Sequence, residues 1–122
     1  MNTAQSSTAL TYNELGRAAL EPVPAKSPHR KYLVLLAMYL LNTDDSSILS
    51  DAADCSERSF HYCKKRLCEE DGVVLTYDRT ARRYVLVQSG VLSLPRLAEL
   101  MQRHYPARYA HMEKLGASMR AN

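Results

Sequence analysis

The sequence predicts a small α+β protein that is mainly helical and contains one β-hairpin. Three observations predict this fold class. Apolar residues recur at helical spacing over residues 28–71 and 94–116, two β-branched runs lie between these segments, and Gly72 and Gly90 mark the changes of period. The 122 residues suit one compact domain with a tail, and the 46% hydrophobic content excludes general disorder.

Residues 1–26 are expected to form an arm or linker. They hold few large apolar residues and end in the proline-interrupted stretch EPVPAKSP. Thr11 and Glu14 have the spacing of a capping box, so a short helix over residues 12–20 is expected there. The N-terminus has neither the basic start nor the apolar stretch of a secretory signal, and the longest apolar run, residues 32–41, is shorter than the roughly 20 residues that span a bilayer. We therefore expect a cytoplasmic protein without a membrane partner.

The first helix of the domain is expected over residues 28–42. Ser27 is a favourable N-cap residue, and Pro28 suits the first helical position because its fixed φ is helical and its missing N–H is not needed there. Leu, Val, Met and Tyr side chains surround this helix on all sides. A helix that is apolar all round is buried, so we expect it at the centre of the core or in a subunit interface.

Two further helices are expected after it. A short one covers residues 47–54, with Ser46 or Ser47 as its N-cap, and the pair of aspartates before it suits the positive end of the helix dipole. After a tight joint, Ser56 is expected to cap a longer helix over residues 57–71. The domain thus continues as two helices joined by a turn.

The chain then changes to the period of strands. Gly72 ends the preceding helix as a C-cap residue. Residues 73–77 and 83–87 are β-branched and aromatic, and the polar residues 78–82 separate them. This pattern predicts a β-hairpin with a short polar loop.

The C-terminal region is expected to be helical. Ser93 is an N-cap for a helix over residues 94–105. Pro106 stops or kinks this helix, and a continuation to about Gly116 is expected.

The helix over residues 57–71 has two distinct faces. At 100° per residue, Phe60, Cys63 and Leu67 form one stripe, which we expect to be buried. The opposite face is cationic and rich in hydrogen-bond donors. It comprises Arg58, Tyr62, Lys65 and Glu69, with His61 and Arg66 at its flanks. Lys64 lies near the edge of the buried stripe, from which its ammonium group is expected to extend towards a phosphate.

Two segments, ILSDAADCSERSFHYCKKRLCEEDGVVLTY and DRTARRYVLV, place a short helix, a turn, a longer helix and a hairpin in sequence. This order resembles a winged helix-turn-helix domain, and the match spans about residues 28–88. Family members share small residues in the first helix, a polar cap, a late Leu and a Gly before the wing. The corresponding residues here are Ala52, Ala53, Ser56, Leu67 and Gly72. The turn departs from the family, because a Gly is common there and this chain has Asp54-Cys55.

The resemblance implies a function and a division of the chain. Residues 27–89 would form the winged helix-turn-helix domain, residues 1–26 the arm, and residues 90–122 a C-terminal helical extension. The resemblance implies a bacterial or phage transcriptional regulator that binds duplex DNA in a sequence-specific manner and without a cofactor. The long helix would enter the major groove, and the hairpin would contact the backbone or minor groove. The residues expected to contact DNA are Ser56, Arg58, Ser59, His61, Tyr62, Lys64, Lys65, Arg66, Arg79, Arg82 and Arg83.

A homodimer is the expected assembly. Regulators of this class often dimerise through helices outside the reading head, and a two-fold dimer matches a palindromic operator. The C-terminal helices offer an apolar stripe for this contact. Its residues are Leu94, Leu97, Met101, Tyr105 and Met112. The alternative is that this stripe packs on the core of its own chain.

The distribution of charge supports an anionic partner but leaves a rival function open. Residues 44–57 contain five acids and no base, whereas residues 58–83 contain seven bases and four acids. Such a change of sign suggests one face directed at an anion. The rival is a winged-helix module that binds other proteins as an adaptor or assembly factor. The net charge of only +3 and the eight acids between Asp44 and Asp71 favour it.

The remaining chemistry of the sequence indicates neither an enzyme nor a metalloprotein. Four glycines leave little material for a phosphate-binding loop, and the four histidines are dispersed. A metal site would need Cys55, His61, Cys63 and Cys68, which contain no C-x-x-C pair. A regulator switched by oxidation of Cys55 or Cys68 is a third hypothesis.

Overall fold

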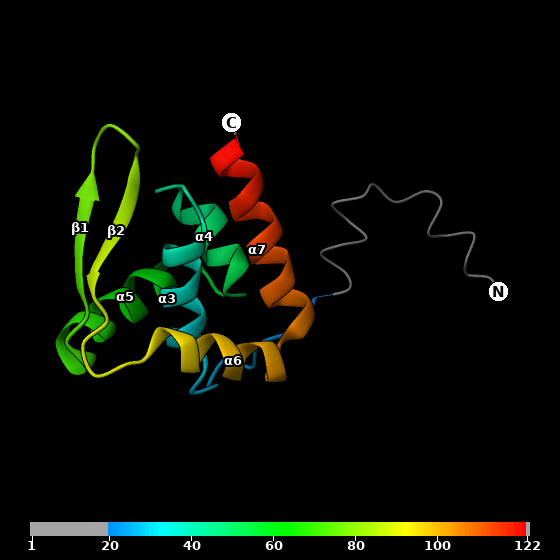
Figure 1. Cartoon of the computed structure of the whole chain (residues 1–122). Coiled ribbons are helices and arrows are strands. Elements are labelled where there is room, and N and C mark those ends of the chain that lie inside the picture. Colours follow the sequence, from blue (N-terminus) through cyan, green and yellow to red (C-terminus); the bar gives the residue numbers. More distant parts are fainter. Residues whose placement is uncertain (1–19, 122) are drawn as a thin grey trace.

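The computed structural model describes residues 20–121 of the chain. The helix expected over residues 12–20 lies outside the described residues apart from Leu20. Within the described part, five helices and one antiparallel hairpin follow one another, which confirms a mainly helical α+β fold. In chain order the elements are α3 (Arg30–Leu40), α4 (Ser46–Ala52), α5 (Glu57–Asp71), β1 (Val74–Asp78), β2 (Arg83–Gln88), α6 (Leu94–His104) and α7 (Pro106–Ala121) (Figure 1).

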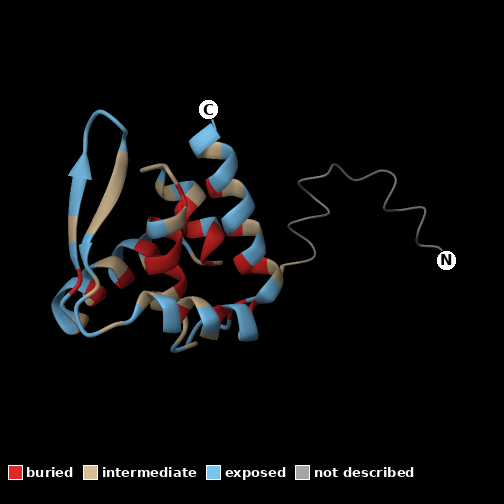
Figure 2. Cartoon of the chain, viewed as in Figure 1, coloured by how far each residue is buried: buried red, intermediate tan, exposed pale blue. Residues whose placement is uncertain are grey.

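Helix α3 is the centre of the fold. All of residues 33–38 are buried, because α4, α5, α6 and α7 pack around this helix and β2 contacts it as well. Figure 2 shows the buried residues gathered around α3, with exposed residues on the outer faces of the surrounding helices. The prediction that the all-round apolar helix is buried at the centre of the core is confirmed.

The start of α3 differs from the prediction. The helix begins at Arg30 with His29 as its N-cap residue, so Pro28 precedes the helix. The hydroxyl of Ser27 accepts a hydrogen bond from the backbone N–H of His29 at 3.1 Å. Because the helix begins only at Arg30, this bond closes a local turn that precedes the helix and does not cap it. The helix also ends earlier, at Leu40, because Leu41 is extended.

Helix α4 is capped by Asp45 and not by a serine. The carboxylate of Asp45 accepts hydrogen bonds from the backbone N–H of Ser47 at 2.9 Å and from its hydroxyl at 2.6 Å. These bonds hold the pKa of Asp45 below its ordinary value. The predicted caps, Ser46 and Ser47, are instead the first two helical residues. A charged carboxylate is the stronger acceptor and also interacts favourably with the positive end of the helix.

The turn between α4 and α5 has no glycine, and Asp54 takes the backbone conformation that a glycine commonly adopts there. Asp54 adopts the left-handed conformation with φ of 55°, which ends α4 two residues before the predicted position. Asp and Asn tolerate this conformation better than other non-glycine residues. The Asp54 carboxylate accepts from the N–H of Val23 at 2.7 Å, and its carbonyl accepts from Arg30 at 3.0 Å. These two bonds fix the turn from outside the α4–α5 pair.

Helix α5 has the predicted bounds and the predicted buried face. The hydroxyl of Ser56 caps it by accepting from the N–H of Ser59 at 3.1 Å. Gly72 ends it with a positive φ of 74°. The stripe expected to face the core is buried, and it consists of Phe60, Cys63 and Leu67.

The hairpin is formed by β1 and β2 in antiparallel register, with Leu75 opposite Leu86 and Tyr77 opposite Tyr84. The Asp78 carboxylate accepts from two backbone N–H groups of the loop at 3.0 Å, and Arg82 takes a positive φ of 54° before the return strand. Strand β1 begins and ends one residue later than predicted, and β2 is one residue longer.

The C-terminal helices complete the same core. Leu97, Met101, Tyr105 and Met112, four of the five residues expected in a dimer interface, are 0 to 8% exposed. Leu94, the fifth, is partly buried against the same cluster. The expected dimer interface is therefore wrong for this fold. The physical reason is that α6 and α7 both pack against the apolar helix α3. The stripe therefore covers the core of its own chain.

Helix α7 continues through Gly116 to Ala121, so the predicted end at Gly116 is wrong. A Cβ atom at Gly116 would lie 2.2 Å from the carbonyl oxygen of Leu40. Gly116 is therefore the place where α7 touches the end of α3, and its missing side chain serves close packing in place of helix termination. None of the helices in the described part is long and apolar enough to cross a membrane.

Residues 20–26 are integrated into the fold. Val23 is buried in the core at 5% exposure. The Glu21 carboxylate accepts from the N–H groups of Ala107 and Arg108 at 2.8 and 2.9 Å and so caps α7. Burial would raise the pKa of Glu21, but these hydrogen bonds outweigh it and lower the pKa. The buried guanidinium of Arg108 donates in turn to the carbonyls of Glu21 and of α4 residues Asp51 and Ala52.

Candidate nucleic-acid interface

The exposed side of α5 is a ridge between two hollows. The hairpin groove, of about 270 Å³, lies between α5 and the hairpin, and α5 contributes His61, Lys64 and Lys65 to it. The linker cleft, of about 540 Å³, lies on the other side of the ridge, between α5 and residues 25–32. Its lining residues from α5 are Ser59, Tyr62, Cys63 and Arg66. Most of the predicted DNA-contacting residues of α5 are therefore divided between the two hollows, whereas Arg58 lines neither of them.

On the hairpin side, Lys64 is held within the protein. Its ammonium group lies 4.4 Å from the centre of the Tyr84 ring and donates to the Tyr84 hydroxyl at 3.2 Å. The expectation that Lys64 extends towards a phosphate is wrong for this structure, because the tyrosine offers a cation–π contact and an acceptor close by.

The arginines of the hairpin differ in how firmly they are held. Arg83 is partly buried and donates to the Asn42 side chain at 3.3 Å. Arg82 is 78% exposed and makes a loose ion pair, 3.8 Å, with Asp44. The same aspartate accepts a hydrogen bond from the Tyr77 hydroxyl, which raises the pKa of Tyr77. Arg79 at the tip is exposed and has no ion pair with an acid of residues 20–121.

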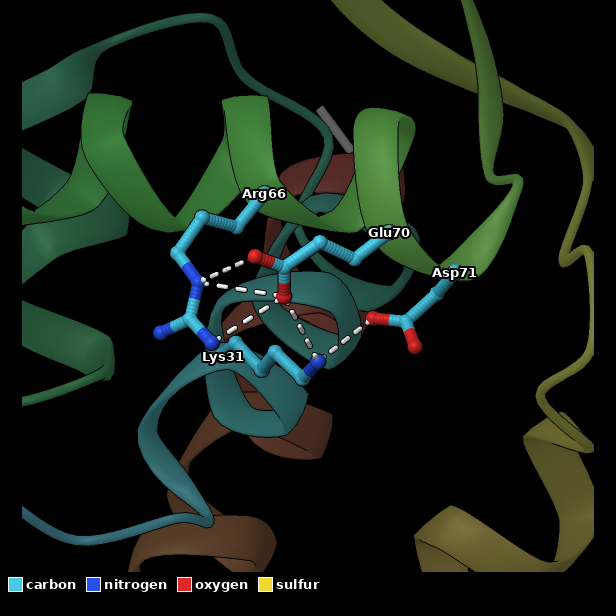
Figure 3. Close-up of polar contacts among 4 residues, drawn as sticks. All are labelled: Lys31, Arg66, Glu70 and Asp71. Atoms are coloured by element: carbon cyan, nitrogen blue, oxygen red, sulfur yellow. Dashed lines mark hydrogen bonds and ion pairs between the residues drawn. The ribbon is translucent and has the colours of Figure 1, made fainter.

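On the linker side, the C-terminal half of α5 is neutralised by ion pairs (Figure 3). Arg66 donates to both carboxylate oxygens of Glu70 at 3.0 to 3.2 Å. Lys31 reaches from α3 and lies 3.7 Å from Glu70 and 2.7 Å from Asp71. The hydrogen bond with Arg66 lowers the pKa of Glu70, and the one with Asp71 raises the pKa of Lys31. These cations compensate carboxylates that lie at the unfavourable, negative end of the helix.

Two cationic side chains on the exposed face of α5 remain available between residues 58 and 65. Arg58 and Lys65 are exposed, and neither has an ion pair within residues 20–121. Tyr62 is 61% exposed, and His61 is exposed beside it. Ser56 and Ser59 are less available, because their hydroxyls bond to each other within the cap. The usable ridge is therefore Arg58, His61, Tyr62 and Lys65.

The cysteines have different environments. Burial raises the pKa of Cys55 to about 11 and also raises that of Cys63. A thiol with a raised pKa carries little thiolate near neutral pH, which disfavours Cys55 as a redox switch. Cys68 is exposed in the hairpin groove. Within residues 20–121, no group of three or more His, Cys, Asp or Glu side chains is placed to hold a metal ion.

Two features of this surface escaped the sequence analysis. The linker cleft includes Lys26, Arg30 and Lys31, which the sequence predicted only as parts of a linker and of the first helix. The signal that could have found them is a cluster of three bases within six residues, KSPHRK. The pairing of Asp44 with the hairpin had no sequence signal, since these residues are 33 or more positions apart.

Comparison of the chain with models of known protein families, with curated proteins and with solved structures finds no match. The functional proposal below therefore depends on the residues of this surface and on the order of the elements.

Proposed function

We propose that this protein is a transcriptional regulator that binds duplex DNA in a sequence-specific manner through a winged helix-turn-helix domain. The observation that carries the proposal is the exposed face of α5 over residues 58–65, where Arg58 and Lys65 have no acidic partner within the described residues. A helix with its side chains is about 10–12 Å wide, and the major groove of B-DNA is about 12 Å wide. Helix α5 stands between two hollows, which leave its outer face accessible to such a groove.

The division of charge along α5 supports this orientation. Recognition helices of helix-turn-helix proteins contact base edges with their N-terminal residues. In α5 that half carries Arg58, His61 and Tyr62, Lys65 lies next to the midpoint, and the three carboxylates of the last turn are at the other end. Arg and Lys donate to the guanine edge, and the remaining donors suit phosphate oxygens. The acidic C-terminal end of α5, which would repel phosphates, would thus lie away from the DNA.

The hairpin supplies a second contact in this proposal. Arg79 and Arg82 lie at its tip, beyond the last paired residues. The loose pair between Arg82 and Asp44 is an exposed ion pair, which typically contributes about 0–1 kcal/mol and is readily exchanged for a phosphate contact. The hairpin arginines are therefore suited to the backbone or to the minor groove beside the α5 site.

The proposal is tested with the double variant Arg58→Ala/Lys65→Ala and a labelled random-sequence duplex. Affinity is measured by fluorescence anisotropy between about 50 and 200 mM salt. Each lost phosphate contact lowers the slope of log K against log salt by about 0.9. We expect the double variant to lose most of the affinity, and the exposed Arg103→Ala on α6 to retain it. Equal affinity of the double variant and the wild type would refute the proposal.

A second candidate function is a winged-helix module that binds another protein. The observation that favours it is the apolar exposure of Val74, Val87 and Val91, at 43, 54 and 83%. Such a module would show no steep salt dependence with DNA.

The homodimer expected from the sequence also needs a contact surface. The exposed valines are available for it, because the C-terminal stripe is buried. Sedimentation of Val87→Lys against the wild type tests that contact: a wild-type dimer that becomes a monomer supports it.

A further inference from the structure

The linker cleft contains cations that do not belong to the ridge of Arg58, His61, Tyr62 and Lys65, which we call the recognition ridge. Among residues 20–121, Lys26, Arg30, Lys31 and Arg66 line the cleft, and no acidic side chain does. Glu70 and Asp71 pair with Arg66 and Lys31, so within the described part the four cations of the cleft have two carboxylates as ion-pair partners. The cleft therefore retains excess positive charge next to α5.

The cations of the cleft are held in place by different means. The Arg30 guanidinium donates to the backbone carbonyls of Val23, Ala25 and Asp54 at 2.9 to 3.0 Å. These acceptors are neutral, and the buried Nε of Arg30 has no acceptor within residues 20–121. Arg30 thus supplies a fixed charge that forms no ion pair with a carboxylate of the described part. Lys31 and Arg66 are positioned by the shared carboxylate of Glu70 (Figure 3).

The cleft also contains groups that can approach an incoming anion directly. Lys26 is exposed, and no ion pair holds it within the described residues. Tyr32 and Tyr62 are also lining residues, each with a phenol hydroxyl that can donate, and the Tyr62 ring lies 5.7 Å from the Arg66 guanidinium. A mobile ammonium group and neutral hydroxyl donors above fixed cations are the components of a phosphate contact.

We propose that the linker cleft binds a phosphate of the DNA backbone, on the strand opposite to the one that the hairpin contacts. This inference rests on the proposed function. A helix in the major groove has a phosphate backbone on each side, and the hairpin lies along only one side of α5. The linker cleft lies along the other side and shares Tyr62 with the recognition ridge. The two hollows would then hold α5 between the two strands.

A duplex fits the cleft better than a free phosphate does. An excess of about two charges in an open cleft gives weak attraction to a single anion, because exposed charges are screened within about 10 Å at 0.1 M salt. A backbone phosphate is instead presented by a duplex already bound through α5 and the hairpin. The cleft then adds one contact to an existing complex.

The test compares Lys26→Ala with Lys114→Ala in the full chain. Lys114 is equally exposed but lies on α7, which Figure 1 shows on the other side of α3 from α5. Loss of one phosphate contact lowers the salt slope by about 0.9, which corresponds to about eightfold weaker binding at 0.1 M salt. We expect this loss for Lys26→Ala, equally on duplexes of different sequence, and no change for Lys114→Ala.

Three results would overturn the inference. If the wild type binds the duplex and Arg58→Ala/Lys65→Ala removes binding, but Lys26→Ala keeps the wild-type slope, the cleft contact is wrong and the proposed function stands. If the wild type binds no duplex at 50 mM salt, both proposals fail. In an NMR titration, saturable shifts of residues 26–32 with inorganic phosphate that duplex DNA does not reverse would assign the cleft to a free phosphate ligand.

Discussion

Replacing Gly116 by alanine should destabilise the protein, although alanine is the better helix former. In an exposed helix position the exchange gains about 1 kcal/mol. At Gly116 the new Cβ would lie 2.2 Å from the carbonyl oxygen of Leu40, whereas real Cβ contacts do not fall below 3.0 Å. The obstacle is backbone, so α3 and α7 must separate by about 0.8 Å. Overpacking of this kind costs about 1–3 kcal/mol, which outweighs the gain in propensity or at least cancels it.

The effect is measured by urea unfolding followed by circular dichroism at 25 °C. We expect a lower midpoint for Gly116→Ala, with the free energy of unfolding reduced by up to about 2 kcal/mol after the gain in propensity is subtracted. Ser118→Ala is the matched control, because Ser118 is exposed on the same helix. It should raise the midpoint slightly. A rise of about 1 kcal/mol for Gly116→Ala would refute the close contact between α3 and α7.

Three further predictions concern stability. Arg108→Met should lower the free energy of unfolding by about 2–4 kcal/mol, because the carbonyls of Glu21, Asp51 and Ala52 lose the donor of a buried guanidinium, whereas the exposed Arg103→Met should be neutral by urea titration. Burial and a neighbouring imidazole lower the pKa of His29, so the unfolded chain binds more protons below about pH 6.5 and stability falls as the pH decreases through that value. Urea midpoints between pH 5 and 7 should vary less for His29→Gln than for the wild type and for His61→Gln; equal pH dependence in all three would contradict this. Asp54→Ala removes the carboxylate and retains the left-handed backbone, so thermal unfolding should show a loss of about 1–3 kcal/mol, and an unchanged melting temperature would exclude that role.

Local sequence signals predicted the elements that carry the proposed interface. Ser56 and Gly72 bound α5 as expected, because a cap depends on residues within three or four positions along the chain. The buried stripe and the opposite cationic face of α5 also followed from helical periodicity. The hairpin followed from its β-branched runs and its Asp78 turn.

The sequence could not predict which cations remain available. Whether Arg66 or Lys64 can contact a ligand depends on Glu70 and Tyr84, and the second of these contacts joins residues 20 positions apart. Lys31 of α3 completes the cluster at the end of α5. Such pairs form only when the helices and the hairpin have packed.

The sequence by itself determined the order of the helices, the hairpin, the central position of α3 and the two faces of α5, since each follows from periodicity and short-range hydrogen bonding. The tertiary structure decided the rest. It placed the C-terminal stripe in the chain's own core, assigned Gly116 to a helix contact, and connected residues 20–26 to α4 and α7 through Arg108 and Glu21. These features depend on which apolar surface remains uncovered and which backbone groups remain unpaired after the elements assemble, and neither quantity exists until the chain has folded.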